Sequence, residues 1–263
     1  YKSLINEISK NKFFRKNLIK KKSFYQDLLK KNKYDLIINC DANNILSKKF
    51  FTKKIDKDYD SQAYITVLMH EKLENNTATQ IFTKRGPIAF LPISNSKTSI
   101  VFSMNTKNRI YNDSEILNLI KKNNPKYKIQ KVLKLNSFKL SSSNLRNYHH
   151  KNILAFGDML HRIHPLAGQG FNMTIRDIRI LSEIIEKKIN LGMQIDSSIL
   201  IDFENQTKSK NFLFSNSIDF IYEAFNFDTK IRSKSFSKIL KIVGKNKSLT
   251  NYLIKFADKG LNF

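Results

Sequence analysis

The residues best suited to chemistry lie in one segment, which reads GDMLHRIHPLAGQGFN over residues 157–172. A compact apolar run at 152–156 predicts a buried strand, and it leads directly into Gly157 and Asp158. In open α/β sheets, ligands bind at the carboxyl ends of strands, where a carboxylate suits hydrogen bonds to the hydroxyls of a sugar or ribityl chain. The segment therefore predicts that Asp158 contacts a polyol.

The turn after Asp158 combines features that favour a bound anion. Pro165 stiffens it, while Gly168 and Gly170 carry no Cβ and allow the backbone to approach a ligand closely. The helix expected to begin near Gln169 directs its unpaired N–H groups and positive dipole end at the turn, which suits an anion or a delocalised oxyanion. Packing glycines would explain G-x-G alone, but the longer string GD-x5-HPLAGQG-x-N is far more specific for a ligand site.

The string GDMLHRIHPLAGQGFNMTIRD resembles the second flavin-binding motif of the aromatic-ring hydroxylase family of FAD-dependent monooxygenases, and HPLAGQGFN is similar to the ubiquinone-biosynthesis hydroxylases. The resemblance implies that Asp158 contacts the ribityl hydroxyls of FAD and that the turn lies against the isoalloxazine ring. It also implies that backbone N–H groups at the helix start stabilise negative charge at flavin N1 and C2=O. The cofactor-binding residues implied in this way are Asp41, Gly157, Asp158, Pro165, Leu166, Ala167, Gly168, Gln169, Gly170, Phe171 and Asn172.

A second stretch, FTKRGPIAFLPIS at 82–94, resembles a middle-domain segment of the same hydroxylases. Gly86 and Pro87 separate two strands there, and the resemblance implies that the strand at 88–91 helps to wall an aromatic-substrate pocket.

A third stretch, DLIINCDANNILSKKF at 35–50, stands where the family has its DG motif. The resemblance implies that Asp41 is an FAD- or NAD(P)H-related residue. The match departs from the family pattern, because Ala42 replaces glycine and Ser47 comes two positions late. Thr174 likewise stands where many members have glycine.

The family opens with a βαβ unit whose G-x-G-x-x-G motif holds the ADP half of FAD. This motif does not occur in the sequence. The chain also begins at Tyr1 rather than at Met. We therefore expect an N-terminally truncated member of the family.

Hydrophobic periodicity predicts the elements that must position these residues. Residues 34–40 indicate a short buried strand ending near Cys40, and residues 59–105 indicate an antiparallel sheet. Residues 112–123 predict a helix capped near Asp113 or Ser114, and residues 129–140 predict further strands. One long amphipathic helix follows the turn, with an apolar face of Phe171, Ile175, Ile178, Leu181, Ile185 and Ile189.

The predicted fold class is α/β with mixed α+β character: a Rossmann-like FAD-binding domain that lacks its first βαβ unit, an inserted antiparallel β-sheet substrate domain, and C-terminal helices. The predicted division assigns 1–55 to the FAD-binding domain, 56–145 to the β-rich substrate domain, 146–195 to the flavin turn and its helix, and 196–263 to the helical region. Breaks between the C-terminal helices are expected near Asn226 and Gly244. The basic, apolar stretch 231–263 suits core packing, with a membrane-surface helix as the alternative.

The formal charge of +25 comes mainly from lysine, since only eight of the 47 basic residues are arginine. Nucleic-acid recognition relies on arginine for bidentate contacts, so a solvated lysine surface is favoured over a nucleic-acid site. His161 and His164, with Cys40 or with His149 and His150, form no recognisable zinc set, so no metal is predicted. Both His161 and His164 are expected to shape the turn. Cys40 is the single cysteine and is expected to be buried. No apolar run approaches the length of a membrane span.

The resemblance implies an FAD-dependent monooxygenase that uses NAD(P)H and O2 to hydroxylate the aromatic ring of a polyprenyl phenol in ubiquinone biosynthesis. No catalytic base is assigned, because the cofactor performs the difficult chemistry. A cytoplasmic location is expected, with peripheral contact at the inner face of the membrane and with a ubiquinone-biosynthesis assembly. The alternative is a catalytically inactive truncated homologue that serves as an assembly or membrane-docking module.

Overall fold

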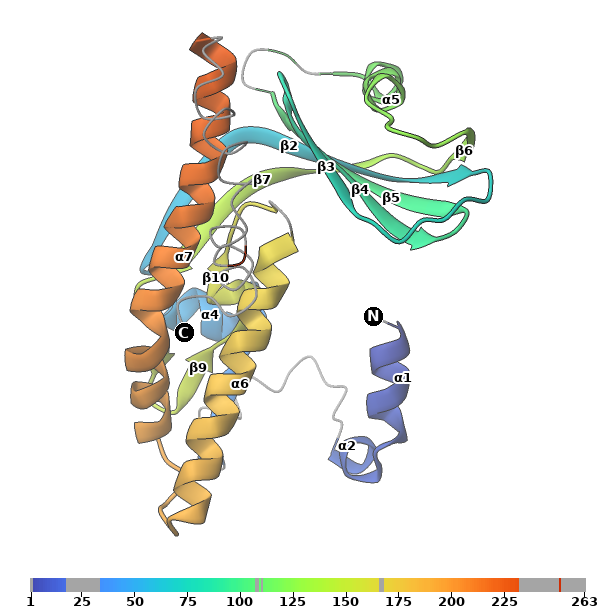
Figure 1. The fold of residues 1–263 in the computed structure, drawn as a ribbon. Coiled ribbons are helices and arrows are strands. Elements are labelled where there is room, and N and C mark those ends of the chain that lie inside the picture. Colours follow the sequence, from blue (N-terminus) through green and yellow to red (C-terminus); the bar gives the residue numbers. More distant parts are fainter. Residues whose placement is uncertain are drawn as a thin grey trace. The chain divides into compact units, whose positions relative to one another are not determined.

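The computed structural model describes residues 2–17, 34–106, 109, 111–165, 168–231 and 251 (Figure 1). It divides into a small unit, residues 1–35, and a large unit, residues 36–263. The small unit contains the helices α1 (Lys2–Lys10) and α2 (Lys12–Asn17). Asn11 separates them and accepts hydrogen bonds from the backbone N–H groups of Phe13 and Phe14 at 2.9 and 3.2 Å, so it acts as an N-terminal cap of α2.

The large unit is dominated by an antiparallel sheet in the order β10-β7-β2-β5-β4-β3, with β6 also paired to β2. Its strands are β2 (Lys54–His70), β3 (Thr79–Thr83), β4 (Gly86–Ser94), β5 (Lys97–Asn105), β6 (Ile129–Val132), β7 (Asn136–Leu145) and β10 (His161–Arg162). Burial alternates along β2, as expected for a strand with one face on a core. The predicted antiparallel sheet and the strands after residue 129 are therefore confirmed.

The core of this sheet lies under the helix α5 (Asp113–Lys122), which covers one sheet face (Figure 1). Ile116 and Ile120 of α5 pack against Phe90 and Phe102 of the sheet, and all four side chains are buried. The predicted helix is confirmed, but its cap is Asn112, which forms a capping box with Glu115.

A second, three-stranded sheet has the order β1-β9-β8. β1 (Ile37–Asn39) runs parallel to β9 (Ile153–Ala155), and β8 (His149–His150) is antiparallel to β9. The predicted strand at 34–40 is thus present but shorter, and Cys40 is exposed rather than buried, because the strand has ended before it. The parallel pair beside a large antiparallel sheet, followed by helices, confirms the predicted fold class. The domain boundaries remain a prediction.

The helix α6 (Gln169–Asn190) begins at the predicted residue, but of its predicted apolar face only Leu181 is buried. Within the described chain, Phe171 is 66% exposed, and Ile175, Ile178 and Ile189 are exposed as well. The buried positions are Gln169, Met173, Asp177, Leu181, Ile184 and Lys188. Polar groups can take the inward positions because they find partners there: Asp177 contacts His161, and Lys188 bonds to Ser198.

The helix α7 (Ser198–Ile231) runs beside α6 (Figure 1). It continues through Asn226, so the predicted break near that residue is wrong. The break expected at Gly244 and the role expected for 231–263 lie outside the described residues, except at 231 and 251. In the described parts of the chain, no helix has both the length and the apolar character needed to cross a membrane.

Candidate functional site

The candidate site lies where the two parallel strands end. Asn39 of β1 is level with Ala155 of β9, and the Phe156 N–H donates to the Asn39 carbonyl at 2.9 Å. Beyond these residues the chain turns into 41–44 on one side and into the 3-10 turn η1 (Gly157–Met159) on the other. The predicted strand before Gly157 is therefore confirmed, and Asp158 stands at the carboxyl edge of a parallel pair, the usual place for a ligand.

A cavity of about 500 Å³ opens at this edge, and Asp158 is part of its wall. The other walls come from the 42–52 segment, from the start of β2 and from the end of β7. The lining residues are Ala42, Asn43, Ser47, Lys48, Phe51, Thr52, Lys54, Ser143, Leu145, Asp158, Met159 and Arg162. Its polar rim places one carboxylate among the basic groups of Lys48, Lys54 and Arg162, so it suits a ligand with both hydroxyl groups and negative charge.

A buried amide and hydroxyl network shapes the 39–47 wall of the cavity. The Asn39 amide donates to Ser47 Oγ at 2.9 Å, and the Asn44 amide donates to Asn39 Oδ1 at 2.6 Å. Asn44 also caps the short helix α4 (Ile45–Phe50) by accepting from the Ser47 N–H at 2.8 Å. Ser47 Oγ lies 3.3 Å from the Met159 sulfur, which ties this wall to the turn that carries Asp158. Ser47 stands two positions later than the serine of the family pattern, but its hydrogen bonds with Asn39 and Asn44 still hold it in the cavity wall.

Asp41 lies outside the cavity lining. Its side chain is exposed and accepts from the Asn43 N–H at 2.8 Å, which closes a local turn. Four further lining residues carry basic or hydroxyl groups that no motif in the sequence by itself indicates: Lys48, Lys54, Ser143 and Arg162. Arg162 could have been found, because it follows Asp158 within the same motif. Lys54 and Ser143 are brought there by the pairing of β2 with β7, which no local pattern reveals.

The turn before α6 has left-handed backbone where glycine is needed. Gly157 has φ +65° and Gly168, the N-cap of α6, has φ +67°. A Cβ built on either residue would meet no atom within 4 Å, so open space borders both. Gly170 differs, since a Cβ there would only touch Ile163 Cγ1 at 3.7 Å. Leu166 and Ala167 lie outside the described residues.

The start of α6 presents its free N–H groups toward this turn. Gln169 is buried and its side-chain carbonyl accepts from the Asn172 amide at 3.4 Å, while Phe171 is exposed. Pro165 is half-buried. Helix geometry alone therefore gives the turn a partial positive charge, which would stabilise a delocalised anion placed against it.

His164 is the most unusual side chain of the turn. It is fully buried, and neither ring nitrogen has a hydrogen-bond partner among the described residues. Its ring stacks on Tyr222 with centroids 4.2 Å apart and meets the edge of Tyr59 at 4.9 Å. Burial lowers the pKa of His164 to about 4, with a smaller contribution from the charge of Lys57. The imidazole is consequently neutral at pH 7.

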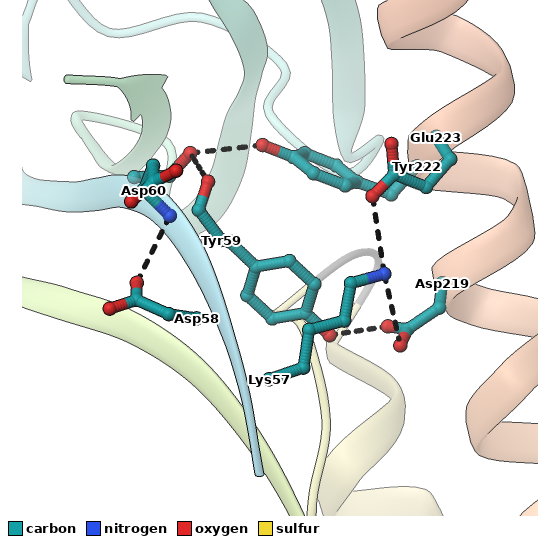
Figure 2. A network of polar contacts seen from close by, with 8 residues as sticks. Lys57, Asp58, Tyr59, Asp60, Asp219, Tyr222 and Glu223 are labelled. Atoms are coloured by element: carbon teal, nitrogen blue, oxygen red, sulfur yellow. Dashed lines mark hydrogen bonds and ion pairs between the residues drawn. The ribbon is translucent and has the colours of Figure 1, made fainter. Parts of the chain in front are cut away.

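Figure 2 shows the polar network beside these rings, which joins β2 to α7. The Tyr59 hydroxyl donates to Asp219, and the Ser61 and Tyr222 hydroxyls lie 3.0 Å apart. Lys57 Nζ lies 3.6 Å from Asp219 and 3.1 Å from Glu223. Burial, assisted by the Asp219 carboxylate, raises the pKa of Tyr59. The network anchors α7 to the sheet on the side of the turn that holds His164.

The chemical types of these residues fit the flavin and ribityl half of FAD. A carboxylate lies in a cavity of suitable size, two left-handed glycines border open space, and a helix N-terminus follows. His161, by contrast, is tied to Asp177 and takes no part in a metal cluster; among the described residues no three His, Cys, Asp or Glu side chains converge.

Comparisons with known proteins agree on one family. A family model described as "FAD binding domain" matches residues 53–192, more than half of the chain. The ubiquinone biosynthesis monooxygenase COQ6 of Dictyostelium discoideum is 28% identical over 241 residues, covering 72% of this chain and 49% of that protein. The 3-demethoxyubiquinol 3-hydroxylase of Escherichia coli K12 is 26% identical over 175 residues, covering 64% and 44%.

Solved structures agree on the fold. The p-nitrophenol 4-monooxygenase PnpA of Pseudomonas putida DLL-E4 has a TM-score of 0.64 at 12% identity, over 87% of this chain and 60% of that one. The chain spans about half the length of the curated relatives it matches. On the match over residues 53–192, this chain belongs to the FAD binding domain family.

Proposed function

We propose that this chain forms part of an FAD-dependent monooxygenase that hydroxylates the aromatic ring of a polyprenyl phenol in ubiquinone biosynthesis, with NAD(P)H as electron donor and O2 as co-substrate. The observation that carries the proposal is the position of Asp158, in a 500 Å³ cavity directly before a glycine-edged turn and the N-terminus of α6. The names of the relatives, ubiquinone biosynthesis monooxygenase and 3-demethoxyubiquinol 3-hydroxylase, support the reaction class and pathway.

In this proposal the FAD, when bound, supplies the chemistry that activates oxygen. The chain's own residues bind and orient it. Asp158 accepts hydrogen bonds from ribityl hydroxyls, and the N–H groups at the start of α6 stabilise negative charge on the flavin ring. The remaining proposed contacts are Asp41, Gly157, Pro165, Leu166, Ala167, Gly168, Gln169, Gly170, Phe171 and Asn172, most of them through backbone. Peripheral membrane contact, and contact with other biosynthetic proteins, belong to the same proposal.

The edge of β1 and the exposed apolar side of α6 are two surfaces that a further part of the FAD-binding domain could cover. Within the described part of the chain, β1 lies at the edge of the sheet β1-β9-β8, and Ile38 on it is half exposed. The apolar residues Phe171, Ile175 and Ile178 of α6 are exposed among the described residues. We propose that a βαβ unit holding the ADP half of FAD covers these surfaces, because a parallel pair is normally buried on both faces.

The test is to express this chain within the complete reading frame that encodes it and to measure flavin absorbance of the purified protein. We expect stoichiometric FAD in the wild type. We expect Asp158→Ala to weaken FAD binding about tenfold or more, because a charge-assisted hydrogen bond contributes about 1.5–3 kcal/mol. Titration of the apoprotein with FAD, followed by flavin fluorescence, gives the dissociation constants.

Asp202→Ala is the matched control, since Asp202 is an exposed carboxylate on α7 outside the cavity lining. It should leave FAD affinity unchanged. Equal affinity in the Asp158→Ala variant and the wild type would remove the ribityl role. A folded, complete protein that retains no flavin would reject the enzyme and favour the alternative of an assembly or membrane-docking module, for which the replacement of the motif glycine by Ala42 is the supporting observation.

A further inference from the structure

A buried hydrogen bond joins the two elements on either side of the flavin turn. His161 Nε2 lies 2.5 Å from Asp177 Oδ2, and both side chains are 1% exposed. The second carboxylate oxygen accepts from the Asn211 amide of α7 at 3.0 Å. Asp177 therefore has a partner on each oxygen, and the three residues come from β10, α6 and α7.

The pair flanks the turn in the chain. His161 precedes the turn on β10, which pairs with β7 at the level of Asn144, so its backbone is held by the large sheet. Asp177 follows the turn by two helical turns, roughly 12 Å along α6 from Gln169. The only chain between these two fixed points is the turn and the first two turns of α6, so the distance between them constrains where the N-terminus of α6 can lie.

An apolar contact lies on the same face of α6, one turn nearer the flavin turn. Met173 is fully buried and packs with Ile163, Phe214 and Ile218. Apolar packing is non-directional and tolerates small sliding. The hydrogen bonds of Asp177 are directional, and shifting α6 by even one ångström would leave a buried carboxylate without its partners, which is costly. The polar group, rather than Met173, is therefore suited to fix the rotation and axial position of α6.

We propose that His161, Asp177 and Asn211 are positioning residues that set the N-terminus of α6 against the flavin ring. This inference rests on the proposed function, since it concerns how tightly and in which redox state FAD is held. None of the three residues lines the cavity that contains Asp158. They act through the helix, whose positive end stabilises the anionic reduced flavin more than the neutral oxidised one.

The experiment uses the complete, FAD-bound protein and the variant Asp177→Asn, which keeps the side-chain shape but removes the charge. We expect FAD affinity to fall about tenfold. We further expect the preference for reduced over oxidised flavin to fall about tenfold, which lowers the two-electron midpoint potential by about 30 mV. Loss of the Asp177 charge alone would raise the potential, so a lower value reports the displaced helix. Affinity is measured by fluorescence titration and the potential by equilibration with reference dyes.

Glu204→Gln is the matched control, because Glu204 accepts from the Tyr148 N–H at 2.9 Å and pairs with Lys208 at 2.6 Å, contacts that hold the start of β8 on α7 rather than β10 on α6. It should lower thermal stability without moving the flavin potential. Asn211→Ala serves as the second variant if Asp177→Asn does not fold, since it removes only one hydrogen bond of Asp177. It should move the potential in the same direction by a smaller amount.

The outcomes separate the two proposals. If the wild type holds FAD and the folded Asp177→Asn and Asn211→Ala variants keep its potential and affinity, the positioning role is overturned while the proposed function stands. If Glu204→Gln shifts the potential as much as Asp177→Asn, the effect is one of general stability and the positioning role is likewise overturned. A complete wild-type protein without FAD overturns both.

Discussion

Replacing Gly86 with alanine is expected to lower the free energy of unfolding of the large unit by about 3 kcal/mol or more. Gly86 opens β4 with φ +131°, a conformation that L-residues rarely adopt. A Cβ there would lie 2.0 Å from the Ser103 carbonyl oxygen of β5, so the two strands would have to separate. The same carbonyl belongs to backbone rather than to a flexible side chain, and it cannot move aside without breaking the sheet.

Gly192→Ala is the control for this prediction. Gly192 also has positive φ, +64°, but a Cβ on it would meet nothing within 4 Å. It should cost only about 1 kcal/mol, the usual penalty for a left-handed residue that gains a Cβ. Urea unfolding of the three proteins gives the free energies. Equal losses for the two variants would show that the close approach of Gly86 to Ser103 has no energetic consequence.

Replacing His164 with phenylalanine is expected to leave the protein at least as stable at pH 7 and to flatten its response to acid. Because burial lowers the folded-state pKa of His164 from 6.5 to about 4, the unfolded chain binds a proton more readily over this range. The contribution of His164 to the free energy of unfolding is therefore fully present above pH 6.5. It is lost as the pH drops toward 4, and the total loss from this residue is about 3 kcal/mol. Phenylalanine cannot be protonated, so this part of the acid loss should disappear.

The neutral or favourable effect at pH 7 follows from the contacts of the ring. The His164 nitrogens have no described partner, while the ring stacks on Tyr222 and Tyr59, and phenylalanine preserves this stacking without burying polar atoms.

His70→Phe is the matched control for that prediction, because His70 is equally buried and also packs on a tyrosine. Its nitrogens, however, bond to the Glu71 carbonyl at 2.8 Å and to Thr98 Oγ1 at 3.0 Å. Its replacement should therefore cost about 1–3 kcal/mol at pH 7. Thermal melts of both variants from pH 4 to pH 7 provide the test, and a His164→Phe variant as unstable at pH 7 as His70→Phe would mean that the His164 nitrogens are bonded.

Local sequence determined most of the elements that position the site. The apolar run before Gly157 forms a strand. Gly157, at the start of η1, and Gly168, the N-cap of α6, occupy the two left-handed positions. These features depend on residues close together in the chain, because steric limits on φ and strand or helix periodicity act over a few residues. The placement of Asp158 at a strand end follows for the same reason.

Tertiary structure alone decided which side chains surround Asp158 and which face of α6 is buried. Lys54 and Ser143 reach the cavity only because β2 and β7 pair, and residues that distant in the chain share no periodic pattern. On α6, the apolar residues Phe171 and Ile175 face outward among the described residues, while Asp177 points inward. Hydrophobic periodicity identified the helix but misplaced most of its buried face, Leu181 excepted, since it assigns every polar residue to solvent. Asp177 is buried because His161 and Asn211, from two other elements, satisfy both of its oxygens.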